Sequence, residues 1–269
     1  MTAANVADAL HSIGIRGSKP TIDALIVELT KARASPTQVL ERLVDVERKE
    51  REQRNLARRS RMAAIGPHKT LDQFDWAWPR SVDKGLYESL CALQFLDDRH
   101  NVLFRGQPGT GKTTLAQGLA LLALQKGYTV RFSTLSAALA DLLRQESQPA
   151  LERRIKRYTL PDLLVLDELG YLPQDSRAAD VLYNVIARRH ERASTIITTN
   201  LAYKQWGAVV PNAACIAALV DRFAQHCHDV DIDGETWRGN RRPAAKAVSA
   251  KPARRNRTGS AGTQPGRDS

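Results

Sequence analysis

A nine-residue stretch, GQPGTGKTT at 106–114, constrains the fold more than any other part of the chain. It lies between an apolar run, NVLFR, and a helical pattern that begins at Lys112. It fits the phosphate-loop pattern G-x-x-x-x-G-K-[ST] from Gly106 to Thr113. Glycines let consecutive backbone amides turn toward a phosphate, and the helix N-terminus adds the positive end of its dipole. The stretch therefore predicts nucleotide binding at the end of a strand.

The phosphate loop also assigns roles to its side chains. Lys112 is expected to reach the β- and γ-phosphates as a cation, and the hydroxyl of Thr113 to ligate Mg²⁺. We therefore expect ATP and Mg²⁺ as cofactors. The residues predicted to bind the nucleotide are Gly106, Gln107, Pro108, Gly109, Thr110, Gly111, Lys112, Thr113 and Thr114.

Strand-like and helical segments alternate through the region that contains the loop. We predict helices at about 112–126, 135–147 and 176–192, and strands at 101–105, 128–133, 162–167, 194–199 and 228–233. Such alternation is typical of a parallel α/β sheet with helices on its faces. The prediction is an α/β core with five parallel strands.

The third predicted strand ends in two carboxylates, Asp167 and Glu168. Ligands of open parallel sheets bind at the carboxyl ends of the strands, so both side chains are expected beside the phosphate loop. Asp167 would hold Mg²⁺ and Glu168 would polarise the attacking water. A protein that only binds nucleotide does not need the second carboxylate, so the pair predicts hydrolysis.

Further polar residues qualify as catalytic. Asn200 follows the fourth predicted strand and can orient water or contact the γ-phosphate. Arg222 lies in an otherwise apolar helical stretch, LVDRF, and can act as an arginine finger toward the ATP of a neighbouring subunit. Arg188 and Arg189 are second candidates for that role. As alternatives to these catalytic roles, Asn200 only forms a turn, and Arg222 only extends from the surface into solvent.

A long basic helix is predicted upstream. Ser35 is a good N-cap, Pro36 suits the first helical position, and Gly66-Pro67 ends the pattern. The helix has about 27 residues and is about 40 Å long at 1.5 Å per residue. Its second half carries like charges on one face, which repel one another and which a phosphate backbone could neutralise. The predicted DNA contacts are Arg48, Arg51, Arg54, Arg58, Arg59 and Arg61.

The net charge of +11 is concentrated in two segments, 48–61 and 241–269, and the rest of the chain is close to neutral. This distribution favours a polyanionic partner, although a basic tail can also serve solubility alone. We predict four regions: a helical DNA- or partner-binding domain (1–65), a linker (66–80), an ATPase core (81–240) and a disordered tail (241–269). The linker aromatics Phe74, Trp76 and Trp78 are expected to pack on the core, with base stacking as the alternative.

Several function classes are excluded. Three scattered cysteines do not form a disulfide framework, so we expect a cytoplasmic protein. His226, Cys227 and His228 are interpreted as a strand end instead of a metal site, because neighbouring strand residues point to opposite faces. Neither a signal peptide nor an apolar run of membrane-spanning length is present.

Together these motifs resemble the AAA+ ATPase core. More specifically, DELGYLP at 167–173, ARRHERASTIITTNLAYKQWG at 187–207, AALVDRFAQHCHDVDIDGETWR at 217–238 and RRSRMAAIGPHKTLDQFDW at 58–76 resemble the IstB family, over about residues 10–238. IstB proteins are ATP-dependent helpers of the transposases of bacterial insertion sequences. The resemblance places the chain near the DnaC and DnaA branch of AAA+ proteins.

The resemblance implies assembly of a homo-oligomer on duplex DNA and stimulation of a partner transposase. By motif position it makes Lys112 and Thr113 the Walker A contacts, Asp167 and Glu168 the Walker B pair, Asn200 sensor 1 and Arg222 the arginine finger. No secure counterpart of the sensor 2 arginine exists, and the basic tail is not a family feature. Two other functions stay open: a DnaC-like replicative helicase loader and a catalytically weak DNA-binding module.

Overall fold

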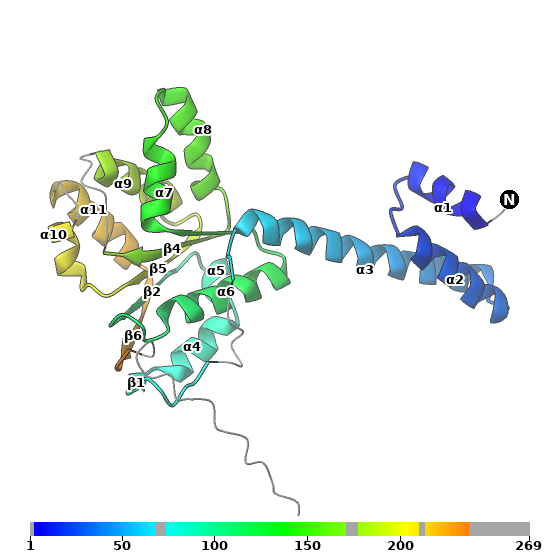
Figure 1. Ribbon diagram of the computed structural model, residues 1–269, viewed down its shortest axis with the longest axis horizontal. Helices are drawn as coiled ribbons and strands as arrows, with labels where there is room; N and C mark the ends of the chain where they lie inside the picture. Colours follow the sequence, from blue (N-terminus) through cyan, green and yellow to red (C-terminus); the bar gives the residue numbers. More distant parts are fainter. Residues whose placement is uncertain (1–2, 68–73, 171–176, 210–212, 237–269) are drawn as a thin grey trace, which may run out of the picture.

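The computed structural model describes residues 3–67, 74–170, 177–209 and 213–236 (Figure 1). The predicted basic tail, residues 68–73 of the linker and residues 171–173 of the DELGYLP motif lie outside the described residues. The chain has a central α/β core and a long helix, α3, that leads away from it to two further helices.

The sheet has six strands in the order β1-β6-β2-β5-β4-β3. The five predicted strands are confirmed and pair in parallel; they are β2 (Asn101–Gly106), β3 (Val130–Thr134), β4 (Leu163–Leu169), β5 (Ser194–Thr199) and β6 (Cys227–Asp233). The sixth, β1 (Ser81–Val82), pairs antiparallel with β6 at the edge. Two residues are too few for an alternating pattern, so the sequence did not predict β1.

Helices cover both faces of the sheet, because successive strand residues point to opposite sides. In β4, Leu163 and Val165 pack in one apolar cluster, and Leu164 and Leu166 in the other. The first cluster lies under α4 (Lys84–Cys91), α5 (Gln94–Asp97) and α6 (Lys112–Lys126). The second lies under α7 (Leu135–Leu143), α8 (Gln148–Thr159), α9 (Arg177–Arg189), η2 (Tyr203–Gln205), α10 (Trp206–Val209) and α11 (Ala213–Ala224).

The predicted helix at 135–147 is shorter than expected, and it is followed by a helix, α8, that the sequence analysis did not predict. α7 ends at Leu143, and α8 starts at Gln148 with Ser147 as its N-cap and Pro149 in its first turn. Pro149 lacks a backbone N–H and disfavours helical geometry in the residue before it, so it belongs at a helix start. The resulting α7–α8 hairpin projects from the core (Figure 1).

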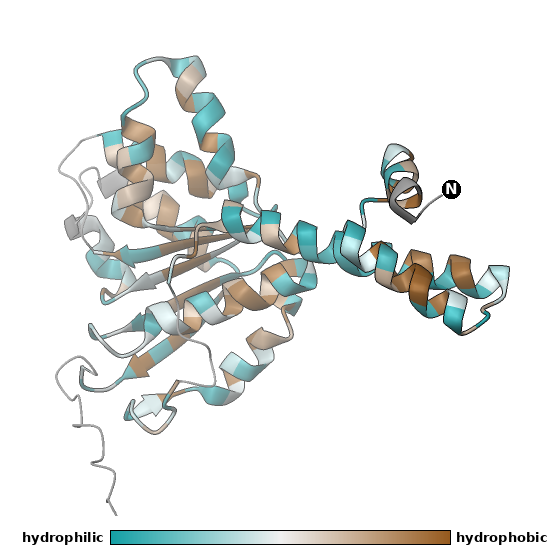
Figure 2. Cartoon of the chain, turned by 45° about the vertical axis from the view of Figure 1, so that its right-hand side comes forward, coloured by the Kyte–Doolittle hydropathy of each residue, from teal (hydrophilic) through white to brown (hydrophobic). Residues whose placement is uncertain are grey.

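The N-terminal helices are α1 (Ala3–Ser12), α2 (Lys19–Lys31) and α3 (Pro36–Ala63). The start of α3 is as predicted: Ser35 and Gln38 form a reciprocal capping box, and Pro36 is the first helical residue. Figure 2 shows hydrophobic residues on the distal parts of α2 and α3 and a hydrophilic stretch of α3 nearer the core.

The C-terminal end of α3 is packed onto the core. Ala63 and Ile65 belong to the apolar cluster beneath α6. Arg131 of β3 donates a hydrogen bond to the carbonyl of Met62 (3.3 Å), and Arg59 donates to the carbonyl of Leu124 in α6 (3.2 Å). These contacts fix the direction in which α3 leaves the sheet.

Candidate nucleotide-binding site

The phosphate loop joins β2 to α6 at the carboxyl edge of the sheet. Gly109 (φ +82°) and Gly111 (φ +98°) have left-handed backbone conformations that side chains disfavour, and α6 starts at Lys112. The ammonium of Lys112 donates to the carbonyls of Gly106 and Gln107, each at 2.8 Å. The loop therefore has the strand–loop–helix context that the motif requires.

Asp167, the first carboxylate of β4, lies against the end of the loop. Its side chain is 4% exposed, and the hydroxyl of Thr113 donates to its two oxygens at 3.0 and 3.1 Å. Hydroxyl and carboxylate oxygens are the ligands that Mg²⁺ prefers, so these residues fit the predicted metal site.

Glu168 has an exposed side chain on the same edge, and its backbone has a φ of +62°. A non-glycine residue rarely adopts this conformation, and such strain is concentrated at functional sites. Asn200 lies close to Gly170, the second residue after Glu168. A Cβ atom at position 170 would be 3.0 Å from Oδ1 of Asn200, so a larger residue at that position would crowd the asparagine side chain.

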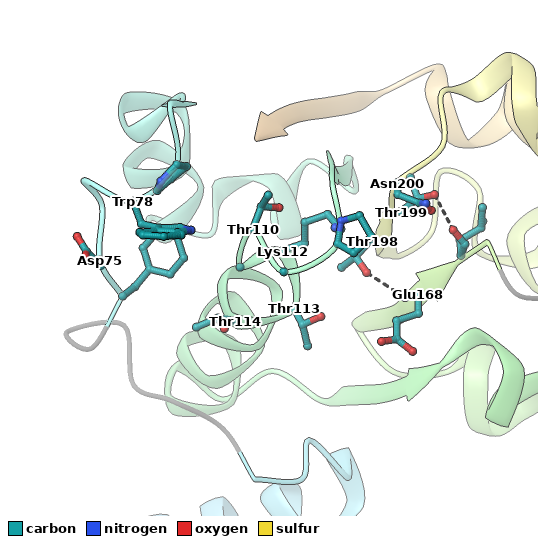
Figure 3. A pocket seen from close by; sticks show the side chains of 16 residues that line it. Asp75, Trp78, Thr110, Lys112, Thr113, Thr114, Glu168, Thr198, Thr199 and Asn200 are labelled. Carbon is teal, nitrogen blue, oxygen red and sulfur yellow. Dashed lines mark hydrogen bonds between the residues drawn. The ribbon is translucent and has the colours of Figure 1, made fainter. Parts of the chain in front are cut away.

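These residues line one pocket of about 380 Å³. One side is formed by the phosphate loop, from Pro108 to Thr114, and another by Glu168, Leu169, Thr198, Thr199 and Asn200 (Figure 3). The third side comes from the linker, with Phe74, Asp75, Trp78 and Pro79. The structure thus brings the loop, Glu168 and Asn200 to one cavity, with Asp167 beneath Thr113.

The aromatic side of the pocket was not predicted. Trp76 packs on Tyr87 of the core (ring centroids 5.4 Å apart) and on Phe74 (4.8 Å), as the packing interpretation expects. Phe74 and Trp78, however, also line the cavity. The Trp78 indole donates to the carbonyl of Glu235 at 3.0 Å, which fixes the ring. The alternating aromatics just before the core were the only signal in the sequence.

Arg222 lies outside this pocket, on α11. Its guanidinium stacks over the ring of Tyr183 (4.8 Å to the centroid) and donates to the Tyr183 hydroxyl. It does not line the cavity of its own chain. The role of Arg222 as an arginine finger toward a neighbouring subunit therefore stays a prediction.

The second candidates for an arginine finger are engaged within the chain. Arg188 makes a bidentate ion pair with Glu152, with both N–O distances 2.7 Å. Arg189 is buried and donates to the hydroxyl of Thr195 and to backbone carbonyls, including that of Pro161 at 2.7 Å. Arg189 is therefore a buried structural residue, which contradicts the suggestion that it acts as a finger. Arg188 joins α9 to α8 at the surface, and its role toward a neighbouring subunit stays a prediction.

The basic face of α3 is only partly available. Glu47 is 8% exposed; its carboxylate accepts from Arg51 (3.2 Å), from Arg54 (3.0 Å) and from the backbone N–H of Arg16 (2.8 Å). Part of the counter-charge for Arg51 and Arg54 thus comes from within the chain. Both side chains stay exposed, and their contact with DNA stays a prediction. Arg59 turns toward α6, as described above.

The remaining predicted DNA contacts, Arg48, Arg58 and Arg61, are exposed. A second group of exposed cations lies on α8. The sequence analysis did not predict this group, although the segment RRIKR at 153–157 carries four basic residues. Its members are Arg153, Lys156 and Arg157. Both groups offer positive charge to a polyanion.

The histidines around β6 do not form a metal site in the described part of the chain, where no group of three or more ligating side chains could hold a metal ion. His226 stacks on His100 with centroids 5.3 Å apart. No helix among the described residues is long and apolar enough to cross a membrane.

A mostly parallel sheet with this loop, carboxylate pair and strand-tip asparagine defines an ATP-binding protein of the AAA+ fold. The fold is similar to that of DnaI (TM-score 0.52, 16% identity, 62% of this chain and 92% of that one). It is also similar to AMPPCP-bound DnaA from Aquifex aeolicus (TM-score 0.50, 20% identity, 63% and 51%).

The chain belongs to the family of IstB-like ATP binding proteins, whose profile matches residues 11–245. It is 34% identical to a protein of insertion sequence IS5376 from Geobacillus stearothermophilus, over 76% of this chain and 81% of the relative. It is 31% identical to a protein of insertion sequence IS21 from Pseudomonas aeruginosa, over 81% and 82%. A Mycobacterium tuberculosis insertion-sequence protein is 30% identical over 88% and 94%.

Proposed function

We propose that the protein hydrolyses ATP with Mg²⁺ as the helper protein of an insertion sequence, and that it assembles on target DNA to stimulate a partner transposase. The observation that carries the proposal is the contact of Thr113 with Asp167, with Glu168 at the edge of the same pocket. These are the positions that phosphoryl transfer to water requires.

In the proposed reaction, most of the groups that hold the reactants come from one chain. The loop amides and Lys112 bind the β- and γ-phosphates, and Thr113 and Asp167 would hold Mg²⁺, which supplies positive charge to the transferred phosphoryl group. Glu168 accepts a proton from the attacking water, and Asn200 orients that water toward the γ-phosphate. Each group faces the cavity or lies against its floor.

The nucleobase has a suitable surface in the same pocket. Phe74, whose ring lies against Gly111 of the loop, and Trp78 line the cavity and offer aromatic surface against which a purine can pack. We infer that the linker binds the base while the loop binds the phosphates. Nucleotide binding would then also act on the segment that connects α3 to the core.

DNA binding is supported by the exposed cations of two separate surfaces. Arg48, Arg58 and Arg61 lie on the arm formed by α3, and Arg153 and Arg157 on the projecting α7–α8 hairpin. Phosphate contacts do not depend on base sequence, so we propose largely nonspecific binding to duplex DNA.

The N-terminal helices are the proposed contact for the transposase. They enclose an apolar groove of about 340 Å³ lined by residues of α1, α2 and α3, Leu25 and Leu29 among them. Leu40 and Val44 of α3 are also largely exposed. Exposed apolar surface of this kind indicates an interaction site.

We also propose that the active oligomer completes each ATP site in trans. Arg222 stands away from the pocket of its own chain and is held by Tyr183. A guanidinium at a subunit boundary can neutralise charge on a neighbour's γ-phosphate. An oligomer that forms on DNA would therefore hydrolyse ATP only once assembled.

The likeness to DnaI keeps a helicase-loading role as the alternative, but its sequence identity of 16% supports the fold alone. The intact Lys112, Asp167 and Glu168 disfavour a catalytically weak DNA-binding module. A pull-down with the element's own transposase and with a replicative helicase separates the two partner hypotheses. Capture of the transposase alone supports the proposal, and capture of the helicase alone supports loading.

The proposed ATPase reaction is tested by comparing the wild type with Lys112→Ala. We expect nucleotide-dependent stabilisation and phosphate release for the wild type in Mg²⁺, and loss of both in the variant, because the cation that contacts the phosphates is removed. Phosphate release that persists unchanged in Lys112→Ala would assign it to another site or to a contaminant.

A further inference from the structure

The pairing of β4 with β5 is irregular where the two carboxylates lie. Leu166 pairs with Ile197, but the next aligned pair is Leu169 with Thr199. Asp167 and Glu168 therefore stand opposite a single residue of β5, Thr198. This is a β-bulge, in which the extra residue loses its regular backbone partner and the strand can re-aim a side chain.

The hydroxyl of Thr198 joins the two carboxylate residues. It donates a hydrogen bond to Oδ1 of Asp167 and accepts one from the backbone N–H of Glu168 at 2.9 Å. Thr198 is fully buried, so water does not compete for either contact. One side-chain oxygen thus supplies the partner that the bulge removes from the N–H of Glu168.

The backbone of Glu168 needs such support. Its φ of +62° is unfavourable for a residue with a side chain and persists only where the surroundings impose it. Regular pairing of β4 with β5 resumes at Leu169, where the hydroxyl of Thr199 donates a hydrogen bond to the Leu169 carbonyl at 2.6 Å. Thr198 is therefore placed to hold the strained turn that aims the Glu168 carboxylate.

We propose that Thr198 is a positioning residue of the ATPase site, whose hydroxyl sets the orientation of the Asp167 carboxylate and of the Glu168 backbone together. The inference rests on the proposed ATP hydrolysis and deepens it. Thr198 acts through its neighbours, because its hydroxyl contacts both the Asp167 carboxylate and the backbone of Glu168 and so links their orientations.

The first variant is Thr198→Val, which keeps the shape and removes the hydroxyl. We expect kcat to fall at least about tenfold, because Glu168 is no longer held toward the water. Affinity for ATP in the absence of Mg²⁺ stays within about threefold, because the loop is untouched, and more Mg²⁺ is needed for half-maximal activity. Thr198→Ser keeps the hydroxyl and is expected to restore kcat.

Thr195→Val is the matched control. Thr195 is on the same strand, is equally buried, and its hydroxyl accepts a hydrogen bond from Arg189 at 3.0 Å, away from the pocket. It should leave kcat and the Mg²⁺ dependence unchanged. An equal loss in both valine variants, or an unchanged kcat in Thr198→Val, would overturn the proposal.

Amide hydrogen exchange provides a readout that does not depend on activity. We expect the N–H of Glu168 to be protected in the wild type and in Thr198→Ser and to exchange rapidly in Thr198→Val. If the valine variant does not fold, the wild type decides: rapid exchange of this amide in the folded protein would refute the proposal. If the wild type releases no phosphate, the proposed function fails, while exchange still tests the role of Thr198.

Discussion

At the scale of the residue, the proposed hydrolysis depends on Glu168, which lines the pocket from a strained position on β4. For Glu168→Gln we expect nucleotide binding close to that of the wild type and hydrolysis lower by about 100-fold or more, since a general base contributes about 10²–10⁴-fold. Single-turnover hydrolysis and binding of a fluorescent ATP analogue measure the two effects. A variant that still hydrolyses ATP at more than a third of the wild-type rate would exclude Glu168 as the base.

Trp78 belongs to the same scale. We expect Trp78→Ala to weaken ATP binding about tenfold, because the aromatic surface proposed for the base is lost, and Trp78→Phe to retain most of the affinity. Titration calorimetry with ATP and with inorganic triphosphate separates base from phosphate contacts. An equal loss for both ligands would mean that Trp78 supports the loop and does not bind the base.

The sequence predicted the residues whose roles follow from a local pattern, and it missed those defined by contacts across the fold. Lys112 and Thr113 are fixed by loop spacing, and Asp167 by its place at a strand end. Nothing in the sequence around Thr198 distinguishes it from other strand threonines. Its position opposite the two carboxylates follows only from the β4–β5 register. Phe74 and Trp78 likewise show their position only once the linker folds over the pocket.

At the scale of the element, α3 both extends away from the core and holds the turn between α1 and α2 in place. Its residues Glu47 and Arg54 hold the turn before α2: Arg54 donates to the carbonyl of Arg16 at 2.6 Å, and Glu47 accepts from the N–H of the same residue. Periodicity alone predicted the helix and its basic face. It could not show that neighbouring acids and the α1–α2 turn use part of that face.

The contacts of Glu47 and Arg54 with the α1–α2 turn predict an effect on the stability of the N-terminal helices. We expect Arg54→Ala to lower the free energy of unfolding of the N-terminal helices by about 1 kcal/mol, because it removes a charged hydrogen-bond donor from Glu47 and from a backbone carbonyl. Arg58→Ala, which changes an exposed residue of the same helix, should change it little. Denaturant unfolding followed by hydrogen exchange of α1 and α2 measures both; equal effects would contradict the assignment.

The exposed part of α3 predicts a separate effect on DNA. We expect the triple variant Arg48→Glu, Arg58→Glu and Arg61→Glu to weaken duplex binding and to reduce the salt slope by about 2–3, at about 0.9 per phosphate contact. ATP binding and thermal stability should be retained because these side chains lie on the surface. Lys204→Glu, an exposed change elsewhere, serves as the control; if the triple variant binds as the wild type does, α3 is not the DNA surface.

At the scale of the whole molecule, the proposed reaction needs more than one chain. We expect Arg222→Ala to abolish DNA-stimulated hydrolysis while ATP still binds, because the residue lies outside its own pocket. Mixing it with Glu168→Gln should restore part of the activity, because one chain then supplies Glu168 and the other Arg222. Absence of any recovery on mixing would place Arg222 outside the neighbour's site.

We propose that ATP hydrolysis, DNA binding and assembly of this protein are one coupled process. The most direct measurement is the rate of ATP hydrolysis with and without duplex DNA, together with sedimentation of the protein under the same conditions. We expect a faster rate with DNA, and large assemblies that form only with ATP and DNA together. An equal rate from a monomer without DNA would contradict it, because the site would then be complete within one chain.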